Sequence, residues 1–123
     1  MTKPTLLLDF DGVIHSYTSG WQGADVIRDP PVDGALEFIM DAREHFVVAI
    51  YSSRSSEQAG IKAMQRWLER WAGHRCFDIR ASDVEWPLQK PAAFLTIDDR
   101  CIQFDGTFPK PAELLGFKPW NKQ

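Results

Sequence analysis

Cysteine is scarce in this chain, with two among 123 residues. Cys76 and Cys101 lie far apart and form neither a C-x-x-C pair nor another metal-type pattern. The sequence therefore offers no disulfide framework and no cysteine-based zinc motif. We expect both thiols to be reduced, as is usual in a cytosolic protein.

Long apolar runs are also missing. The N-terminus reaches only three leucines before Asp9, which is too short for the core of a signal peptide. No stretch approaches the ~18 apolar residues that a membrane-spanning helix needs. The sequence therefore predicts a cytoplasmic protein without contact to the membrane.

Excess positive charge is absent, since the formal net charge is −3. This balance argues against a strong general affinity for nucleic acid, which depends on basic surfaces. It does not exclude a nucleotide or a strand end as substrate, because a few local cations can bind one.

Several catalytic motifs are missing as well. The chain has no Walker A, G-x-G-x-x-G or G-x-S-x-G sequence. Cys76 follows His74 and Arg75 as in a cysteine phosphatase, but Ser82 stands where that class needs an arginine. These absences exclude the corresponding nucleotide-binding and nucleophilic sites.

The patterns that are present predict a single α/β domain over residues 1–123. Apolar runs alternate with segments of helical periodicity, and the composition is typical of a globular protein. Such alternation implies a Rossmann-like, three-layer α/β/α sandwich around a mainly parallel, five-stranded sheet. The expected strands are residues 5–8, 46–51, 77–81, 94–97 and 101–104; the expected helices are residues 33–44 and a segment that runs from an S-x-x-Q capping box at 55–58 to Gly73.

Polar side chains cluster where the expected strands end. In an open α/β sheet, functional groups collect at the carboxyl ends of the strands. We therefore expect four acids, one hydroxyl and one ammonium group to converge on one edge of the sheet. They are Asp9 and Asp11 after the first strand, Ser52 after the second, Asp98 and Asp99 after the fourth, and Lys90 just before the fourth.

This combination suits phosphate chemistry. Residues i and i+2 of an extended segment point to the same side, so Asp9 and Asp11 can serve one phosphorus atom as nucleophile and proton donor. Four carboxylates would repel a phosphate dianion, so a cation is required, and Mg²⁺ suits an all-oxygen site. Lys90 and the Ser52 hydroxyl can hold phosphoryl oxygens, and Gly12 allows a sharp turn that presents N–H groups to the anion.

Four motifs occur in order: D-F-D-G-V at residues 9–13, Ser52 after an apolar strand, Lys90–Pro91, and Ile97–Asp98–Asp99. This set resembles the motifs of the haloacid dehalogenase superfamily and covers roughly residues 5–105. The resemblance implies an aspartyl-phosphate intermediate at Asp9, acid/base catalysis by Asp11, and phosphate contacts from Ser52 and Lys90. It also implies Mg²⁺ held by Asp9, the Asp11 carbonyl and the Asp98–Asp99 pair, without showing which of that pair touches the ion.

A shorter likeness links residues 51–54 and 97–100 to the phosphatase half of polynucleotide kinase-phosphatases. It makes Ser53 and Arg54 candidate substrate contacts. Ser53 could equally cap the following helix, and Arg54 could equally be a surface group. Asp98–Asp99 could also be a helix cap, and Lys90 an ordinary surface lysine.

The superfamily usually inserts a cap domain after the first strand or between the second and third motifs, and neither gap has room here. Capless relatives tend to act on large substrates or to oligomerise. The resemblance thus favours a nucleotide, a polynucleotide end or another large phosphoester as substrate, and allows a homo-oligomer. The segment from His15 to Trp21 would lie over the site, which makes His15, Tyr17 and Trp21 candidate substrate contacts.

Other functions stay open. A response-regulator receiver has a similar length and residue set, but its lysine comes last, whereas Lys90 precedes Asp98–Asp99. A catalytically inactive binding protein of the same fold would be expected to lack Asp9 or Asp11. A phosphotransferase or mutase would need a cap or an acceptor site that the sequence does not show.

Overall fold

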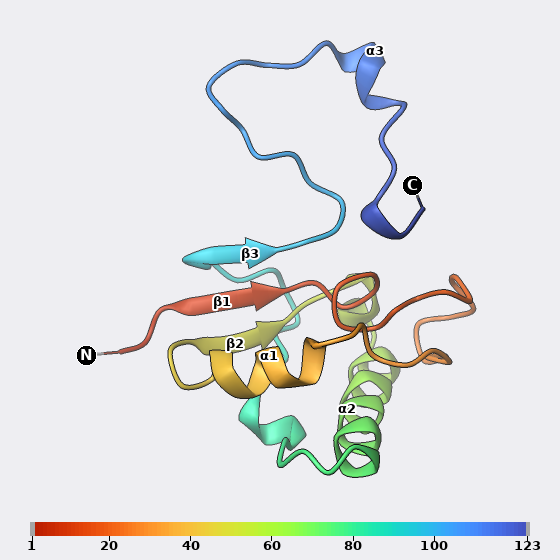
Figure 1. Ribbon diagram of the computed structural model, residues 1–123, viewed down its shortest axis with the longest axis vertical. Coiled ribbons are helices and arrows are strands. Elements are labelled where there is room, and N and C mark those ends of the chain that lie inside the picture. Colours follow the sequence, from red (N-terminus) through yellow and green to blue (C-terminus); the bar gives the residue numbers. More distant parts are fainter. Residues whose placement is uncertain (1, 123) are drawn as a thin grey trace.

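The computed structural model describes residues 2–122 as an α/β structure built on a small parallel sheet (Figure 1). The α/β class and the parallel sheet predicted from the sequence are confirmed. Elements labelled η are single turns of 3-10 helix. In chain order the elements are β1 (Thr5–Leu8), α1 (Ala35–Ala42), β2 (Val47–Ile50), η1 (Ser53–Ser56), α2 (Gln58–His74), η2 (Ala81–Asp83), β3 (Leu95–Ile97), α3 (Pro111–Leu114) and η3 (Trp120–Lys122).

The three strands end at the same level. β1 is the middle strand, and β2 and β3 run parallel to it on either side. The register pairs Leu8 of β1 with Ile50 of β2 and with Ile97 of β3. A middle parallel strand is covered on both faces, which explains the uninterrupted leucine run of β1. The residues after the strands therefore emerge together at one edge.

The hydrophobic core joins the sheet to α1 and α2. Leu8 and Ile50 belong to one buried cluster with apolar side chains from both helices. Met64 and Trp67 of α2 are among its largest buried members, and burial of such side chains stabilises the fold by roughly 1.5–3 kcal/mol each. The Trp67 indole also donates to the carbonyl of Asp29 at 2.9 Å, so the core fixes the long loop between β1 and α1.

The expected strand at residues 77–81 does not form, because local hydrogen bonds use its backbone groups. The Phe77 amide bonds to the Ala72 carbonyl at the end of α2, and the Arg80 amide bonds to the Asp83 carboxylate at 2.8 Å. Groups engaged in this way are withdrawn from a strand ladder. The chain reaches β2 only later, where Glu85 makes an isolated parallel bridge with Ala49.

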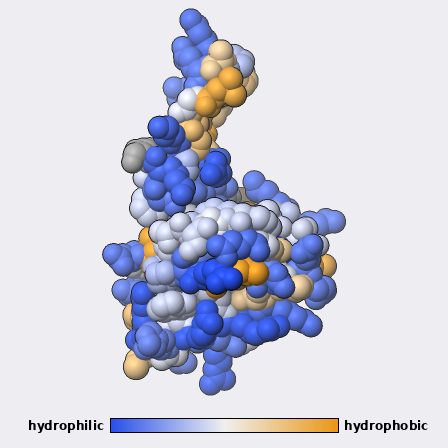
Figure 2. Space-filling view, turned by 90° about the vertical axis from the view of Figure 1, so that its right-hand side faces the viewer, coloured by the Kyte–Doolittle hydropathy of each residue, from blue (hydrophilic) through white to orange (hydrophobic). Residues whose placement is uncertain are grey.

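The expected strand at residues 101–104 is also absent. The chain leaves the sheet after β3 and forms a projecting arm, residues 100–117, which stands apart from the body and carries apolar surface (Figures 1 and 2). Ile102 and Phe104 are each 59% exposed, and no residue of β3 is buried. Three paired strands are thus present in the described residues where five were expected. The arm contains one short helix, α3.

The turn after β2 differs from the expected capping box at residues 55–58. Ser52 caps η1 instead: its hydroxyl accepts the Arg54 N–H at 2.9 Å, and the Ser55 hydroxyl accepts the Ser52 N–H at 3.1 Å. α2 then begins at Gln58 without a side-chain cap. Gly60 lets the two helices pack closely, because a Cβ there would overlap the Arg54 carbonyl.

Within residues 2–122, none of the helices has both the length and the apolar character needed to cross a membrane.

Candidate active site

A pocket of about 200 Å³ opens at the carboxyl ends of the strands. It unites predicted site residues from three distant parts of the chain: the end of β1, the turn after β2, and the segment around β3. Parallel pairing in register is what brings these parts together. The lining residues are Leu7, Asp9, Tyr51, Ser52, Ser53, Lys90, Thr96 and Asp98.

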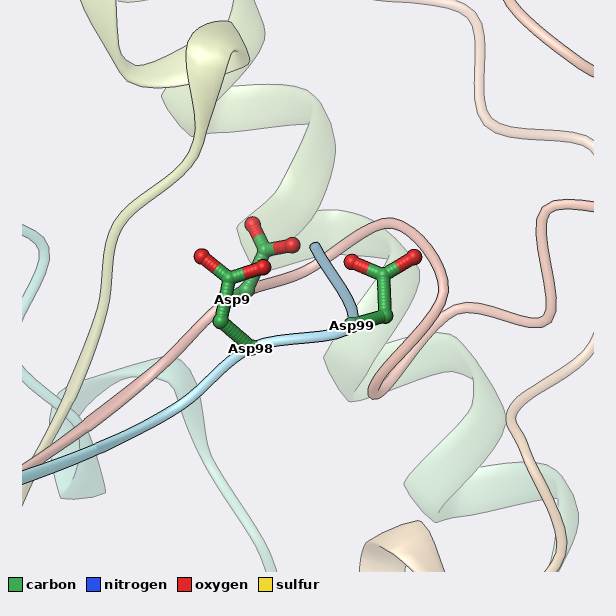
Figure 3. A group of neighbouring side chains, drawn as sticks. All are labelled: Asp9, Asp98 and Asp99. Carbon is green, nitrogen blue, oxygen red and sulfur yellow. The ribbon is translucent and has the colours of Figure 1, made fainter. Parts of the chain in front are cut away.

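Three carboxylates form a compact cluster beside this pocket. Asp9, Asp98 and Asp99 each offer an oxygen atom, and these atoms all lie within 4.8 Å of one another. Figure 3 shows the side chains projecting to the same side from the ends of β1 and β3. The Asp9 amide bonds to the Ile97 carbonyl at 3.0 Å, so the last ladder bond of the sheet sets their spacing.

The cluster is electrostatically strained. The pKa of Asp9 is raised from 3.8 to about 8, first by burial, then by its hydrogen bond with Asp99 and the negative charge of Asp98. Each of these influences favours the protonated carboxyl over the carboxylate. At neutral pH the group therefore holds a proton unless a cation takes its place.

The donor set fits Mg²⁺. All three ligands are carboxylate oxygens, which this ion prefers over nitrogen or sulfur, and the raised pKa of Asp9 marks a site that lacks positive charge. Asp98 and Asp99 are both close enough to share an ion with Asp9. The side chain of Asp11 is not a member of this cluster.

Gly12 is needed where the chain turns beside the cluster. Its φ of +85° lies in the left-handed region, and a Cβ at this position would overlap the carboxylate of Asp99. The indole N–H of Trp120 donates to the Gly12 carbonyl at 2.8 Å. The C-terminal end of the described chain therefore supports the turn that carries the predicted motif.

The polar residues that line the pocket differ in how readily their side chains can turn toward a bound anion; they are Ser52, Ser53 and Lys90. Ser52 is buried, and its hydroxyl is already engaged as the cap of η1. Ser53 and Lys90 are exposed, so they can turn toward an anion without losing a buried partner. Of the two predicted phosphate contacts, Lys90 is thus free to bind, while Ser52 holds the turn in shape.

Asp11 lies in a separate polar group. Its carboxylate accepts a hydrogen bond from His15 Nδ1 at 2.9 Å and from Arg54 Nε at 3.0 and 3.2 Å. Both partners are almost completely buried. His15 and Arg54, expected as substrate contacts, are buried partners of Asp11, and none of the three residues lines the pocket.

Two aromatic residues of the loop after Gly12 border this group. Trp21 lies over the Arg54 guanidinium, 4.8 Å from ring centroid to Cζ, and is 50% exposed. Tyr17 contacts the His15 ring edge-on and adopts a φ of 61°, which is uncommon for a residue other than glycine. Burial and the nearby charge of Asp11 raise the pKa of the Tyr17 hydroxyl.

Sequence reasoning missed three residues that support the site. Asp29 and Trp67 hold the His15 side of the loop, and Trp120 holds the Gly12 turn. Their partners lie 14, 38 and 108 positions away along the chain. No local sequence pattern predicts these contacts.

Comparison of the chain with known protein families, curated proteins and solved structures finds no match.

The strain at Asp9 predicts how stability depends on pH. Unfolding releases a proton from Asp9 between its unfolded pKa near 3.8 and its folded pKa of about 8, so its contribution to stability is greatest below pH 4 and is lost as the pH rises to 8. Asp9→Asn should remove this pH-dependent loss of stability, because asparagine does not titrate. In EDTA, the Tm of the variant should exceed that of the wild type at pH 8.5, and the difference should shrink toward pH 5.

Asp25→Asn, which changes an exposed carboxylate on a loop, is the matched control and should leave the pH profile of Tm unchanged. A Tm difference between Asp9→Asn and wild type that is constant from pH 5 to 8.5 would contradict the crowding of the three acids.

Proposed function

We propose that this chain is a Mg²⁺-dependent phosphomonoester hydrolase of the haloacid dehalogenase type, with Asp9 as nucleophile and Asp11 as general acid/base. The observation that carries the proposal is the shared pocket of Asp9, Ser52, Lys90 and Asp98. These residues come from distant parts of the sequence, and a purely structural role for each would not require that they meet. Their order along the chain supports the superfamily resemblance.

The reaction divides into two balanced steps. An Asp9 oxygen attacks phosphorus and forms an aspartyl phosphate, while the bond to the leaving oxygen breaks and Asp11 gives that oxygen a proton. Asp11, now a carboxylate, takes a proton from an incoming water as its oxygen attacks the same phosphorus. The bond to Asp9 then breaks, inorganic phosphate leaves, and both aspartates return to their starting states.

The pocket supplies charge for the phosphate. Lys90 offers one mobile ammonium group at the wall, and the exposed Ser53 hydroxyl offers a hydrogen bond. Mg²⁺ bound by Asp9 and the Asp98–Asp99 pair would neutralise the cluster and draw the negatively charged phosphoryl group toward Asp9. This requirement for both cations follows from the three acids, which would otherwise repel the substrate.

The strand order supports a reduced form of the superfamily fold. β1 carries Asp9 at the centre, β2 and β3 flank it, and Glu85 begins a further pairing beside β2. A full sandwich would need another strand next to β3, where the apolar edge is exposed. An open edge of this kind can pair with another chain, so a homo-oligomer through β3 belongs to the proposal.

A large phosphoester is the favoured substrate, because Trp21 is 50% exposed and lies over the guanidinium of Arg54, the partner of Asp11. A nucleotide or a strand end could stack there, and base–aromatic stacking contributes roughly 1–3 kcal/mol.

The catalytic assignment is tested by amide replacement. Asp9→Asn should lower kcat for a phosphomonoester in Mg²⁺ by at least about 100-fold, because an amide is a poor nucleophile, and Asp11→Asn by about 10²–10⁴-fold, because it loses the proton donor. EDTA should abolish wild-type activity. Asp25→Asn serves as control and should retain it. An Asp9→Asn variant that keeps more than a few per cent of the wild-type rate would refute the nucleophile.

The stacking role of Trp21 predicts a substrate-dependent loss. Trp21→Ala should lower kcat/KM for a nucleotide or a phosphorylated oligonucleotide by about 5- to 150-fold, the equivalent of ~1–3 kcal/mol. It should change kcat/KM for phenyl phosphate little, because that substrate is too small to reach the indole. Phe108→Ala removes an exposed ring from the arm and is the control. If Trp21→Ala lowered kcat/KM equally for the nucleotide and for phenyl phosphate, Trp21 would act through Arg54 and not by stacking on the substrate.

A further inference from the structure

Asp11 is held by two buried donors that point at it from different directions. His15 follows it closely in the chain, while Arg54 comes from η1, 43 positions away. The exposed fraction of His15 is 1% and that of Arg54 is 0%. A fully buried arginine is rare unless its donors are paired, so the partners of Arg54 reveal what it does.

The hydrogen bonds of His15 determine its tautomer. The backbone N–H of Asp29 donates to His15 Nε2 at 3.1 Å. Nε2 must therefore be the unprotonated nitrogen, and the ring proton lies on Nδ1, where it donates to Asp11 Oδ1. Phe10 stacks on the imidazole at 5.5 Å, and Trp67 meets it edge-on at 5.6 Å. The ring can neither flip nor tilt without breaking these contacts.

Arg54 divides its donors between Asp11 and the loop. Nε donates to both oxygens of Asp11, and Nη1 donates to the carbonyls of Gly23, Ala24 and Val26 at 2.8–3.1 Å. Trp21 covers the guanidinium from outside. These acceptors and the indole hold the fully buried side chain in place, while its Nη2 has no hydrogen-bond partner among the described residues.

The two donors leave Asp11 with one oxygen less occupied. Oδ1 accepts from both His15 and Arg54, whereas Oδ2 accepts only from Arg54. A carboxyl group that exchanges a proton with the leaving group needs a free lone pair on one oxygen, and the arrangement leaves it on Oδ2. An unrestrained aspartate would rotate about its side-chain bonds and lose this alignment.

We propose that His15, as a neutral Nδ1–H donor, and Arg54 are positioning residues that fix the orientation of the Asp11 carboxyl group for proton transfer. This inference rests on the proposed function and adds to it two residues that touch neither substrate nor metal. It also explains why the loop from Ser16 to Asp29 is tied to η1: the carbonyls of that loop fix the arginine that fixes the acid. A substrate that displaced this loop would misalign the acid as well.

The inference is tested with leaving groups that differ in their need for a proton. Dinitrophenyl phosphate releases a stable phenolate without protonation, whereas phenyl phosphate needs an acid. His15→Phe keeps an aromatic ring but removes the donor. In Mg²⁺, it should lower kcat/KM for phenyl phosphate by about 10- to 100-fold, a part of the ~10²–10⁴-fold that general acid catalysis contributes, and should change kcat/KM for dinitrophenyl phosphate less than about 3-fold.

Two further variants make the test specific. His15→Asn places an amide N–H near the position of Nδ1 and should restore kcat/KM for phenyl phosphate to within about 5-fold of wild type. Arg54→Lys keeps the charge but not the Nε donor, and should show the same leaving-group selectivity as His15→Phe. Ile39→Ala weakens the buried core at α1 without changing a donor to Asp11; as the control for lost stability, it should affect both substrates alike.

The possible results distinguish the positioning role of His15 and Arg54 from the proposed hydrolase function. Equal losses of His15→Phe on both substrates, or no rescue by His15→Asn, would overturn the positioning role while leaving the hydrolase intact. A wild-type protein that hydrolyses neither aryl phosphate, no nucleotide and no phosphorylated oligonucleotide in Mg²⁺ would overturn the proposed function itself, and the positioning role with it.

Discussion

The crowding of three carboxylates at one end of a parallel sheet is the constraint on which the rest of this structure depends. Parallel pairing in register places Asp9 next to Asp98 and Asp99, and the cost appears as the raised pKa of Asp9. Such a cluster opposes folding at neutral pH unless a cation or a proton relieves it. The left-handed turn at Gly12 makes room for the three carboxylates, because a side chain at this position would overlap the carboxylate of Asp99.

The environments of Asp9 and Asp11 differ although the two residues are neighbours. Asp9 lies among negative charges, whereas Asp11 is bonded to an arginine and a histidine. Different surroundings can give chemically identical side chains different chemical behaviour. In this protein the separation is made by the loop between β1 and α1, which carries His15 and the acceptors of Arg54.

The sequence predicted those parts of the fold that depend on local pattern. β1, β2, β3 and α2 lie close to their expected positions because apolar runs and helical periodicity are strong signals. The meeting of Asp9, Ser52, Lys90 and Asp98 also followed from strand ends in a parallel sheet. The failures have causes that the apolar pattern does not show. Hydrogen bonds to Ala72 and Asp83 remove residues 77–81 from the sheet, and residues 101–104 have no surface to cover them. Arg54 could not be told from a surface residue, because its acceptors come from a distant loop.

Calorimetric titration of the metal-free protein with Mg²⁺ at pH 7, in buffers of different ionisation enthalpy, tests the central claim most directly. The proton that Asp9 holds through its pKa of about 8 must leave when the ion binds. The account predicts a single site that releases about one proton per ion, and no release from Asp9→Asn. Binding without proton release, or the absence of Mg²⁺ binding at millimolar concentration, would contradict it.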